Sequence, residues 1–426
     1  MTRGSEGAPP PAMTRLRVED LAAFRRRSAR QRRAVLDPRV IGSARATIAA
    51  VRRRGDRAVL AEVRRFDRAG ARIGDLWVDA AALRRAARRC PRELGRAIDD
   101  AYASLLAFHA RQRPRAVEHD GRAFRTALVP ESLDRVGGCV PRGATAYPST
   151  ALMIGVPARV AGVRELVLAS PMPPGGAIDP VLAYAAAKVG VSGLYRAGGA
   201  AAVAALAYGT ESVARVDKIV GPGNAYTTAA KWLVSADVGI DSLAGPSELI
   251  VVASAGADPA AIALDLAAQA EHGGGPFAAL LSDDEALLAT VAKAVRTLGA
   301  PRGSVGIYRA PSLGAALEAA AEAAPEHLSL AGPAAARLAS RARRAGAVFV
   351  GTRTAVAFGD YVAGSNHVLP TGGTARWASA LRVDDLVRWT TRVRATGDLR
   401  RAARTGVAVA RYEGMRYHAS SMELRA

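Results

Sequence analysis

Residues 248–282, ELIVVASAGADPAAIALDLAAQAEHGGGPFAALLS, decide the fold class. The apolar run ELIVVAS is followed by an Ala-rich segment of helical period, and the apolar run FAALLS comes next. Short apolar runs that alternate with helical segments indicate βαβ units, which build a parallel sheet covered by helices. The sequence therefore predicts an α/β fold.

The same alternation continues on both sides of this stretch, in the runs ELVLAS, DKIVG, SVGIY and AVFVG. The turn-like segment GIDSLAGPSE divides it, so we expect a first α/β domain over residues 136–246 and a second over residues 247–388. The second domain includes a Gly-rich stretch after Gly359 that reads as a loop.

The flanking regions have different patterns. Residues 1–18 contain Pro, Gly and Ser and are expected to be disordered. Residues 19–135 are predicted to be an α-rich region, with helical breaks at Gly55, Gly70 and Gly74, which packs with the second α/β domain. Residues 389–426 are expected to form a C-terminal tail that contains a basic helix.

Composition excludes several classes of protein. Half of the 426 residues are hydrophobic and 23% are charged, which excludes disorder for most of the chain. No run of about 18 uncharged apolar residues exists, so no membrane span is expected. The N-terminal residues lack the apolar core of a signal peptide, and two cysteines cannot build a disulfide framework. We therefore expect a cytoplasmic protein without membrane partners.

The net charge of +21 first suggests a nucleic-acid partner. Residues 1–150 hold 32 basic and 16 acidic residues, whereas residues 151–350 hold 15 and 16. The basic residues of the flanks alternate with acidic ones in helical patterns, which is typical of solvated helix faces. Zinc-finger spacing and internal repeats are also lacking, so no nucleic-acid partner is expected.

Gln269 and His272 are three residues apart at the end of a helical pattern, which places an amide oxygen and an imidazole on one helix face. Such ligands suit Zn²⁺, although two ligands do not make a site. A helix C-terminal histidine beside a Gly-rich turn explains the same pattern.

Glu326 and His327 are adjacent and precede an apolar run. Neighbouring residues of an extended segment point to opposite sides, and a carboxylate and an imidazole are the usual general bases. From the residues alone, a solvent-facing glutamate beside a structural histidine is the better explanation of the pair.

Three further segments combine polar side chains with turns. Asp360, Asn366 and His367 lie in a Gly-rich loop, where side chains either serve function or bond their own backbone. The segment VDKIVGPGNAY reads as strand, turn and helix start. The start of such a helix can bind an anion, but this segment alone is a weak signal for a dinucleotide site. Glu413 and His418 lie in the tail, where a frayed terminus is the simpler explanation.

Taken together, these segments resemble the motif set of the histidinol dehydrogenase family over roughly residues 20–426. The resemblance is carried, in order along the chain, by FHARQ (108–112), YPSTALM (147–153), PARVAGV (157–163), ALAYGTE (205–211), VDKIVGPGNAY (216–226), GIDSLAGPSE (239–248), QAEH (269–272), APEHL (324–328), GDYVAGSNHVLPTGGTAR (359–376) and EGMRYH (413–418).

The resemblance implies two incomplete Rossmann-like domains and a homodimer whose C-terminal tails are exchanged. It implies one zinc ion per subunit and NAD⁺ as cofactors, with L-histidinol as the substrate. The reaction would run through L-histidinaldehyde to L-histidine with two NAD⁺, the last step of histidine biosynthesis.

The resemblance also assigns residues. The implied zinc ligands are Gln269, His272, Asp360 and His418, and the implied bases are His327 for the alcohol proton and Glu326 for a water. The implied substrate contacts are Ser247, Gln269, His272, His327, Asp360, Glu413 and His418. If the tails are exchanged, Glu413 and His418 complete the site of the other subunit.

The chain departs from the family at two positions to which the resemblance assigns a contact with the cofactor. Cys139 stands where the family pattern has Tyr, and Ala201 stands where it has Gln, so that only Asn224 is retained of the three. Losing a stacking ring and an amide predicts weaker NAD⁺ binding, by about tenfold together. Arg142 offers a charge that can pair with a cofactor phosphate.

Two alternatives remain open at this point. A paralogue could oxidise a different small alcohol or use an altered nucleotide site. A non-catalytic or nucleic-acid-binding protein would have no dehydrogenase activity and would show salt-sensitive binding to DNA or RNA. Retention of both Glu326 and His327 argues against the second alternative.

Overall fold

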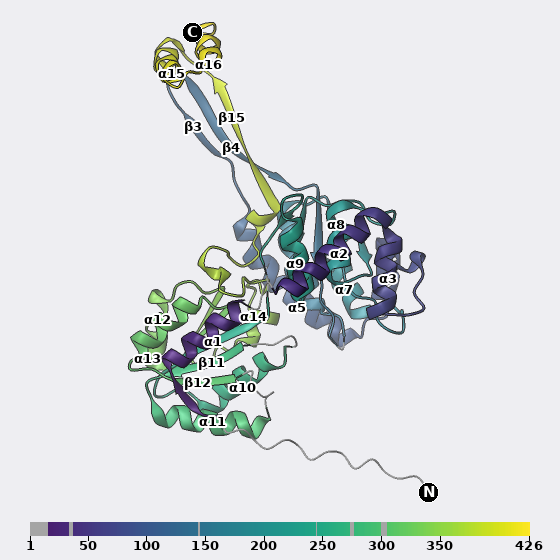
Figure 1. Cartoon of the computed structure of the whole chain (residues 1–426), viewed down its shortest axis with the longest axis vertical. Helices are drawn as coiled ribbons and strands as arrows, with labels where there is room; N and C mark the ends of the chain where they lie inside the picture. Colours follow the sequence, from purple (N-terminus) through teal and green to yellow (C-terminus); the bar gives the residue numbers. More distant parts are fainter. Residues whose placement is uncertain (1–15, 34–36, 144, 244, 273–276, 300–304) are drawn as a thin grey trace.

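A computed structural model describes residues 16–33, 37–143, 145–243, 245–272, 277–299 and 305–426. Two α/β units form the body of the molecule, and an arm that ends at the C-terminus projects away from it (Figure 1). The predicted α/β fold is confirmed, because each unit contains a six-stranded sheet with helices packed against it. Among the described residues, no helix is both long and apolar enough to cross a bilayer.

The first unit is built on a sheet of strand order β2-β7-β6-β5-β8-β9, in which only β2 is antiparallel to its neighbour. Its strands are β2 (Trp77–Asp79), β5 (Arg135–Cys139), β6 (Glu165–Ala169), β7 (Gly193–Tyr195), β8 (Lys218–Val220) and β9 (Gly239–Ile240). Its helices are α2 (Pro38–Arg54), α3 (Asp56–Phe66), α4 (Ala80–Ala87), α5 (Arg92–His109), α6 (Pro148–Ala161), α7 (Pro180–Val189), α8 (Gly199–Tyr208) and α9 (Ala225–Val234).

The second unit is built on an all-parallel sheet of order β1-β12-β11-β10-β13-β14. Its strands are β1 (Val18–Asp20), β10 (Glu248–Ala253), β11 (Phe277–Ser282), β12 (Val305–Arg309), β13 (His327–Ala331) and β14 (Ala347–Val350). Its helices are α1 (Leu21–Arg33), α10 (Pro259–Ala270), α11 (Glu285–Leu298), α12 (Leu313–Ala323), α13 (Pro333–Ala336) and α14 (Ala357–Tyr361).

Aspartate followed by proline starts three of these helices. The side chains of Asp37, Asp179 and Asp258 each accept a hydrogen bond from a backbone N–H in the first turn of α2, α7 and α10. Proline at the first helical position lacks only an N–H that has no partner within the helix. The Asp-Pro pairs therefore fix where these three helices begin.

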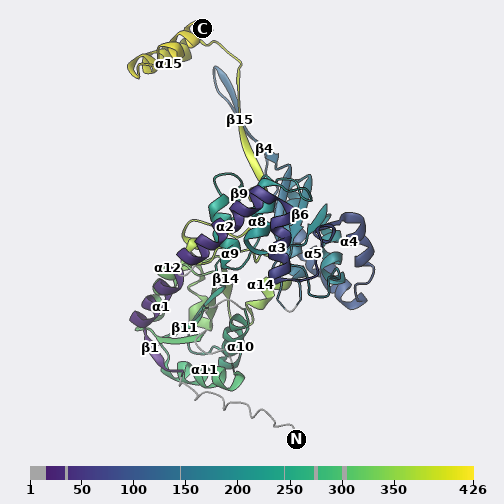
Figure 2. The same ribbon diagram turned by 45° about the vertical axis from the view of Figure 1, so that its right-hand side comes forward.

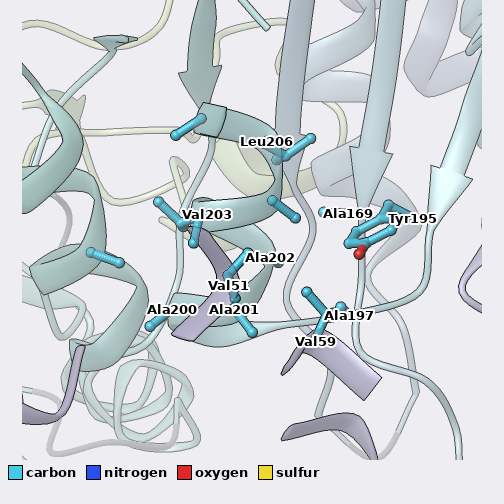
Figure 3. Close-up of a cluster of buried hydrophobic side chains, with 14 of the residues drawn as sticks. Val51, Val59, Ala169, Tyr195, Ala197, Ala200, Ala201, Ala202, Val203 and Leu206 are labelled. Carbon is cyan, nitrogen blue, oxygen red and sulfur yellow. The ribbon is translucent and has the colours of Figure 1, made fainter. Parts of the chain in front are cut away.

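Each six-stranded sheet is covered by apolar side chains on both faces. In the first unit, Ala200, Ala201 and Val203 of α8 pack against side chains of α2 and α3 (Figure 3). Small side chains let the helices approach the sheet closely, so the Ala-rich segments of the sequence belong to the core.

The α-rich region does not pack as predicted. Only β1 and α1 join the second unit, through β12 and α12. Helices α2 to α5 pack against helices of the first unit, and β2 extends the first sheet at β7. The expected packing of residues 19–135 with the second domain is thus wrong for most of the region, because the apolar faces of these helices are buried against α6, α7, α8 and α9. Residues 1–15 of the expected disordered segment lie outside the described residues.

The arm contains strands that the sequence analysis did not predict. It is an antiparallel sheet of order β15-β4-β3, made of β3 (Val117–Asp120), β4 (Phe124–Ser132) and β15 (Val387–Ala395). Helices α15 (Arg400–Tyr412) and α16 (Arg416–Glu423) follow β15 and pack against each other at its far end (Figure 1). Residues 389–426 therefore begin in a strand and continue as two helices.

Candidate active site

The candidate site lies where the carboxyl edge of the first sheet is joined to the amino edge of the second. Strand β9 ends at Ile240, a connection runs from Asp241 to Ser247, and β10 begins at Glu248. Contacts between the units also cross here, since Thr150 in the first turn of α6 lies 3.4 Å from His367, measured from Oγ1 to Nε2.

Glu326 is buried at the amino edge of the second sheet, directly before β13. Its Oε2 accepts hydrogen bonds from the Ser247 hydroxyl at 2.5 Å and from the Glu248 backbone N–H at 2.9 Å. Burial raises the pKa of this carboxyl to about 7, against the opposing effect of the two donors. A carboxyl that titrates near neutral pH is suited to general acid–base chemistry.

His327 is the first residue of β13 and is also buried. Its Nδ1 lies 3.0 Å from the carbonyl oxygen of Glu248, which can only accept, so Nδ1 carries the proton. Burial lowers the pKa of the ring, which is therefore neutral at pH 7. In this tautomer Nε2 has a lone pair and can take a proton from a bound molecule.

Two of the predicted ligands, His272 just after α10 and Asp360 on α14, interact electrostatically with the same two residues. The positive charge of His272 lowers the pKa of Glu326 and opposes protonation of His327, and it also lowers the pKa of Asp360. Burial is the larger effect on Asp360 and raises the pKa of its carboxyl. His272 and Asp360 thus lie close enough to Glu326 and His327 to affect their pKa values.

Gln269 is buried in the last turn of α10, and its Nε2 has no hydrogen-bond partner among the described residues. A buried amide end without a partner is destabilising. A half-turn of the carboxamide exchanges its two ends, so this position can present oxygen to a cation. His272 lies just beyond the helix and is exposed.

Asn366 and His367 follow α14 and hold the segment around Asp360 in place. The Nδ1–H of His367 donates to the backbone oxygen of Asp360 at 3.1 Å, and burial lowers the pKa of His367 to about 4. The Nδ2–H of Asn366 donates to the Met153 carbonyl of α6 at 2.7 Å, and its Oδ1 accepts from the Val368 N–H at 2.9 Å. Asn366 therefore combines turn chemistry with a bond to the first unit.

The four predicted metal ligands do not come together within one chain. Glu413 is the C-cap of α15 and His418 lies on α16, at the far end of the arm, whereas α14 with Asp360 lies in the body (Figure 1 and Figure 2). Both side chains are exposed. Within the described ranges, no group of three or more His, Cys, Asp or Glu side chains is placed to hold a metal ion.

The predicted cofactor residues differ in exposure. Asn224 is exposed after β8 and caps α9, because its Oδ1 accepts from the N–H groups of Tyr226 at 3.1 Å and Thr227 at 3.0 Å. Cys139 ends β5 and is buried, which raises the pKa of its thiol to about 11. Ala201 lies in the core of the first unit (Figure 3).

Sequence reasoning did not single out Thr150, nor the buried pair Lys231 and Asp241 behind the turn that carries Asn224. A signal for Lys231 existed. Lysine occurs only at positions 188, 218, 231 and 293 of this Arg-rich chain, and Lys231 interrupts an otherwise uncharged helical segment.

Comparisons with known proteins agree over nearly the whole chain. The family model described as histidinol dehydrogenase matches residues 30–426. The chain is 42% identical to the histidinol dehydrogenase of Gluconobacter oxydans (strain 621H) over 422 residues, covering 96% of each protein. It is 38% identical over 387 residues to that of Saccharolobus solfataricus, covering 91% of this chain and 96% of the relative. The crystal structure of histidinol dehydrogenase from Elizabethkingia anophelis matches with a TM-score of 0.83 and 30% identity, covering 90% of this chain and 91% of that one.

Proposed function

The chain belongs to the histidinol dehydrogenase family of NAD-dependent oxidoreductases, and we propose that it oxidises L-histidinol through L-histidinaldehyde to L-histidine. The proposal includes two NAD⁺ per turnover and one zinc ion per subunit. Its main support is the pair Glu326 and His327, which lie buried side by side. Ser247 and the Glu248 N–H donate hydrogen bonds to Glu326, and the Glu248 carbonyl accepts one from Nδ1 of His327.

In the first oxidation, His327 would act as the general base. Its Nδ1–H is engaged by the Glu248 carbonyl at 3.0 Å, so the substrate hydroxyl proton would go to Nε2. The hydride leaves carbon as the O–H bond breaks, and the products are the aldehyde, reduced cofactor and one proton. The neutral ring that burial favours is the form that this step requires.

In the second oxidation, Glu326 would act on water. Its carboxylate takes a proton from the water that adds to the aldehyde, and the resulting hydrate loses a second hydride to give the acid. The Ser247 hydroxyl and the Glu248 N–H both donate to Oε2, which orients the carboxylate through both steps. Holding the aldehyde in the site protects it from side reactions.

The residues present fit a zinc ion if a second subunit contributes. The donors are the amide of Gln269, whose buried end lacks a partner, His272, Asp360, and His418 of the partner subunit. When bound, zinc would hold the imidazole and amino nitrogens of the substrate, and NAD⁺ would accept hydride. Substrate contacts are assigned to Ser247, Gln269, His272, His327, Asp360, Glu413 and His418. The last two lie at the far end of the arm, and the others lie in the body.

The arm supports a homodimer in which the tails are exchanged. It projects from the body (Figure 1), and large apolar side chains on it are exposed, among them Trp389, Tyr412 and Tyr417. We further propose that both α/β units are incomplete Rossmann-like domains, with residues 389–426 as the exchanged tail. In the second unit, the parallel strands β10, β11 and β12 follow one another through α10 and α11.

Mixed subunits test the exchange. His418→Ala and His327→Ala chains are each expected to be inactive alone. After mixing and refolding, heterodimers with exchanged tails contain one intact site, so about a quarter of wild-type activity should return. No recovery beyond the two parent proteins would mean that each site is built within one subunit.

The decisive assay is oxidation of L-histidinol by zinc-loaded protein with NAD⁺ and, separately, with NADP⁺. We expect reduction of two NAD⁺ per histidinol and formation of histidine. No turnover with either nucleotide would overturn the proposal.

The second candidate is a paralogue that oxidises a different small alcohol or uses an altered nucleotide site. Burial of Cys139 and Ala201, which replace two expected cofactor contacts, favours it. Turnover of other amino alcohols with a higher kcat/KM than histidinol, or a preference for NADP⁺, would support this candidate.

A further inference from the structure

The first unit contains a buried ion pair that the reaction scheme does not use. The Lys231 ammonium on α9 pairs with the Asp241 carboxylate just after β9, and the two side chains are 1% and 5% exposed. Burying two charges costs more desolvation free energy than burying apolar side chains of similar size, so packing alone does not explain the pair.

The pair holds both backbone groups of one glycine. The Lys231 ammonium donates to the Gly221 carbonyl at 3.0 Å, and Asp241 Oδ2 accepts from the Gly221 N–H at 2.6 Å. Apolar replacements would leave both groups of Gly221 without these partners. The ion pair therefore fixes the position of the peptide groups around Gly221.

Gly221 is the residue at which the turn after β8 crosses the end of β5. Its φ is +102°, and a Cβ atom built on it would lie 2.5 Å from the carbonyl oxygen of Cys139. The backbone is thus confined on one side by β5 and on the other by the ion pair. Asn224, three residues later, caps α9 and is the exposed residue of this turn.

The same carboxylate also starts the connection to the second unit. Asp241 Oδ1 accepts from the Ser242 N–H at 2.6 Å, and the connection continues to Ser247, which donates to Glu326. Asp241 therefore accepts one hydrogen bond from the turn, at Oδ2, and one from the connection, at Oδ1.

We propose that Lys231 and Asp241 are positioning residues for NAD⁺, which hold the turn Gly221–Asn224 in the geometry that receives the dinucleotide. This inference rests on the proposed function for the identity of the cofactor. Neither residue needs to touch NAD⁺, because their effect is transmitted through the backbone of Gly221.

The test uses full-length, zinc-loaded protein with Lys231→Met, Asp241→Asn and the double variant. The double variant removes both charges, so it avoids the unpaired buried charge that each single variant leaves. A matched control, Lys188→Met with Asp99→Asn, removes a half-exposed pair of the same unit that lies on α7 and α5. NAD⁺ affinity is measured by calorimetry, and KM is measured separately for NAD⁺ and histidinol.

We expect the double variant to weaken NAD⁺ binding and raise the NAD⁺ KM at least tenfold. Its histidinol KM and zinc content should stay within about twofold of wild type, and the control pair should change none of these. An NAD⁺ affinity within twofold of wild type in the double variant would overturn the inference, as would equal increases of both KM values.

The binding measurement separates this inference from the proposed function. If wild-type protein binds NAD⁺ but does not oxidise histidinol, the proposed function fails, while the loss of NAD⁺ affinity in the double variant still decides the role of the pair. If wild-type protein binds no NAD⁺ at all, both proposals fail.

Discussion

The two sheets of the body place their candidate residues at opposite edges. The turn with Asn224 follows the carboxyl end of β8, whereas Glu326 and His327 stand at the amino end of β13. Ligands of parallel α/β sheets usually bind beyond the carboxyl ends of the strands. The candidate cofactor residue of the first sheet lies at this usual edge, and the candidate bases of the second sheet lie at the other.

Chain direction explains the difference. Strand β9 leaves the first sheet at its carboxyl edge, and only residues 241–247 separate it from β10, which enters the second sheet at its amino edge. A connection of this length keeps the two edges close together. The amino edge of the second sheet is therefore the one that can share a site with the first.

The two edges also differ in what they bury. The candidate groups at the second edge, Glu326 and His327, are buried and titratable, with pKa values shifted by burial. At the first edge, Asn224 is exposed and neutral, and the charged pair lies behind the turn. We expect substitutions at the second edge to reduce kcat and substitutions at the first to raise the KM for NAD⁺.

The largest effect should come from His327→Ala at the second edge. Removing the base should lower kcat for histidinol oxidation by about a thousandfold. Zinc content, measured by atomic absorption, should not change, because His327 is not among the proposed ligands. His119→Ala, at an exposed position on β3, is the matched control and should retain full activity. Loss of zinc from His327→Ala would mean that a ligand has been mistaken for the base.

Glu326→Gln should separate the two oxidations. The amide oxygen can still accept from Ser247 and Glu248, but it cannot take a proton from water. The aldehyde step should slow by about a hundredfold while the alcohol step is reduced much less. Single-turnover measurements of NADH should then show one fast equivalent followed by one slow equivalent. Equal slowing of both steps would contradict the division of roles between Glu326 and His327.

At the first edge, Asn224 has a structural and a proposed binding role, which two substitutions can separate. Asn224→Ser keeps a side-chain cap for α9 but removes the amide, and Asn224→Ala removes both. Both variants should raise the KM for NAD⁺ by about tenfold with kcat little changed. Only Asn224→Ala should also lower the melting temperature. A KM for NAD⁺ that is normal in Asn224→Ser would place the cofactor contact elsewhere.

The sequence predicted the α/β units because their strands are short apolar runs between helical segments, as in ELIVVAS and FAALLS. It did not predict the arm, because β3 is exposed throughout and β4 and β15 are mostly exposed or half-buried, so these strands lack the apolar run of a core strand. Nor could it assign α2 to α5 to a unit, since an amphipathic helix carries no signal for which apolar surface will cover it.

The candidate site was predictable only in part. The motifs identified Glu326, His327, Gln269, His272 and Asp360, and His272 and Asp360 lie close enough to Glu326 and His327 to affect their pKa values. The hydrogen bond that orients Glu326 was not predictable, because its donor Ser247 and Glu326 are 79 residues apart in sequence. His418 shows a further limit: its position on the arm gains a proposed function only through a second chain.

The smallest expected effect concerns a carboxyl behind the second edge. Asp265 lies on α10 four residues before Gln269, and its side chain accepts a backbone hydrogen bond from Val356, which precedes α14. Burial raises the pKa of this carboxyl to about 6 from an ordinary value of 3.8. The folded state therefore holds the proton more tightly than the unfolded chain does.

The protonated acid favours folding, so its contribution to stability is complete below pH 3.8 and is lost as the pH rises through about 6. Asparagine can accept the same bond and stays neutral. Asp265→Asn should therefore raise the melting temperature at pH 7.5 by about 2 °C and have little effect near pH 4. Thermal unfolding of both proteins from pH 4 to 7.5 measures this difference. A difference in melting temperature that is constant with pH would show that Asp265 does not titrate in this range. The raised carboxyl pKa values near the second edge would then belong only to residues of the candidate site.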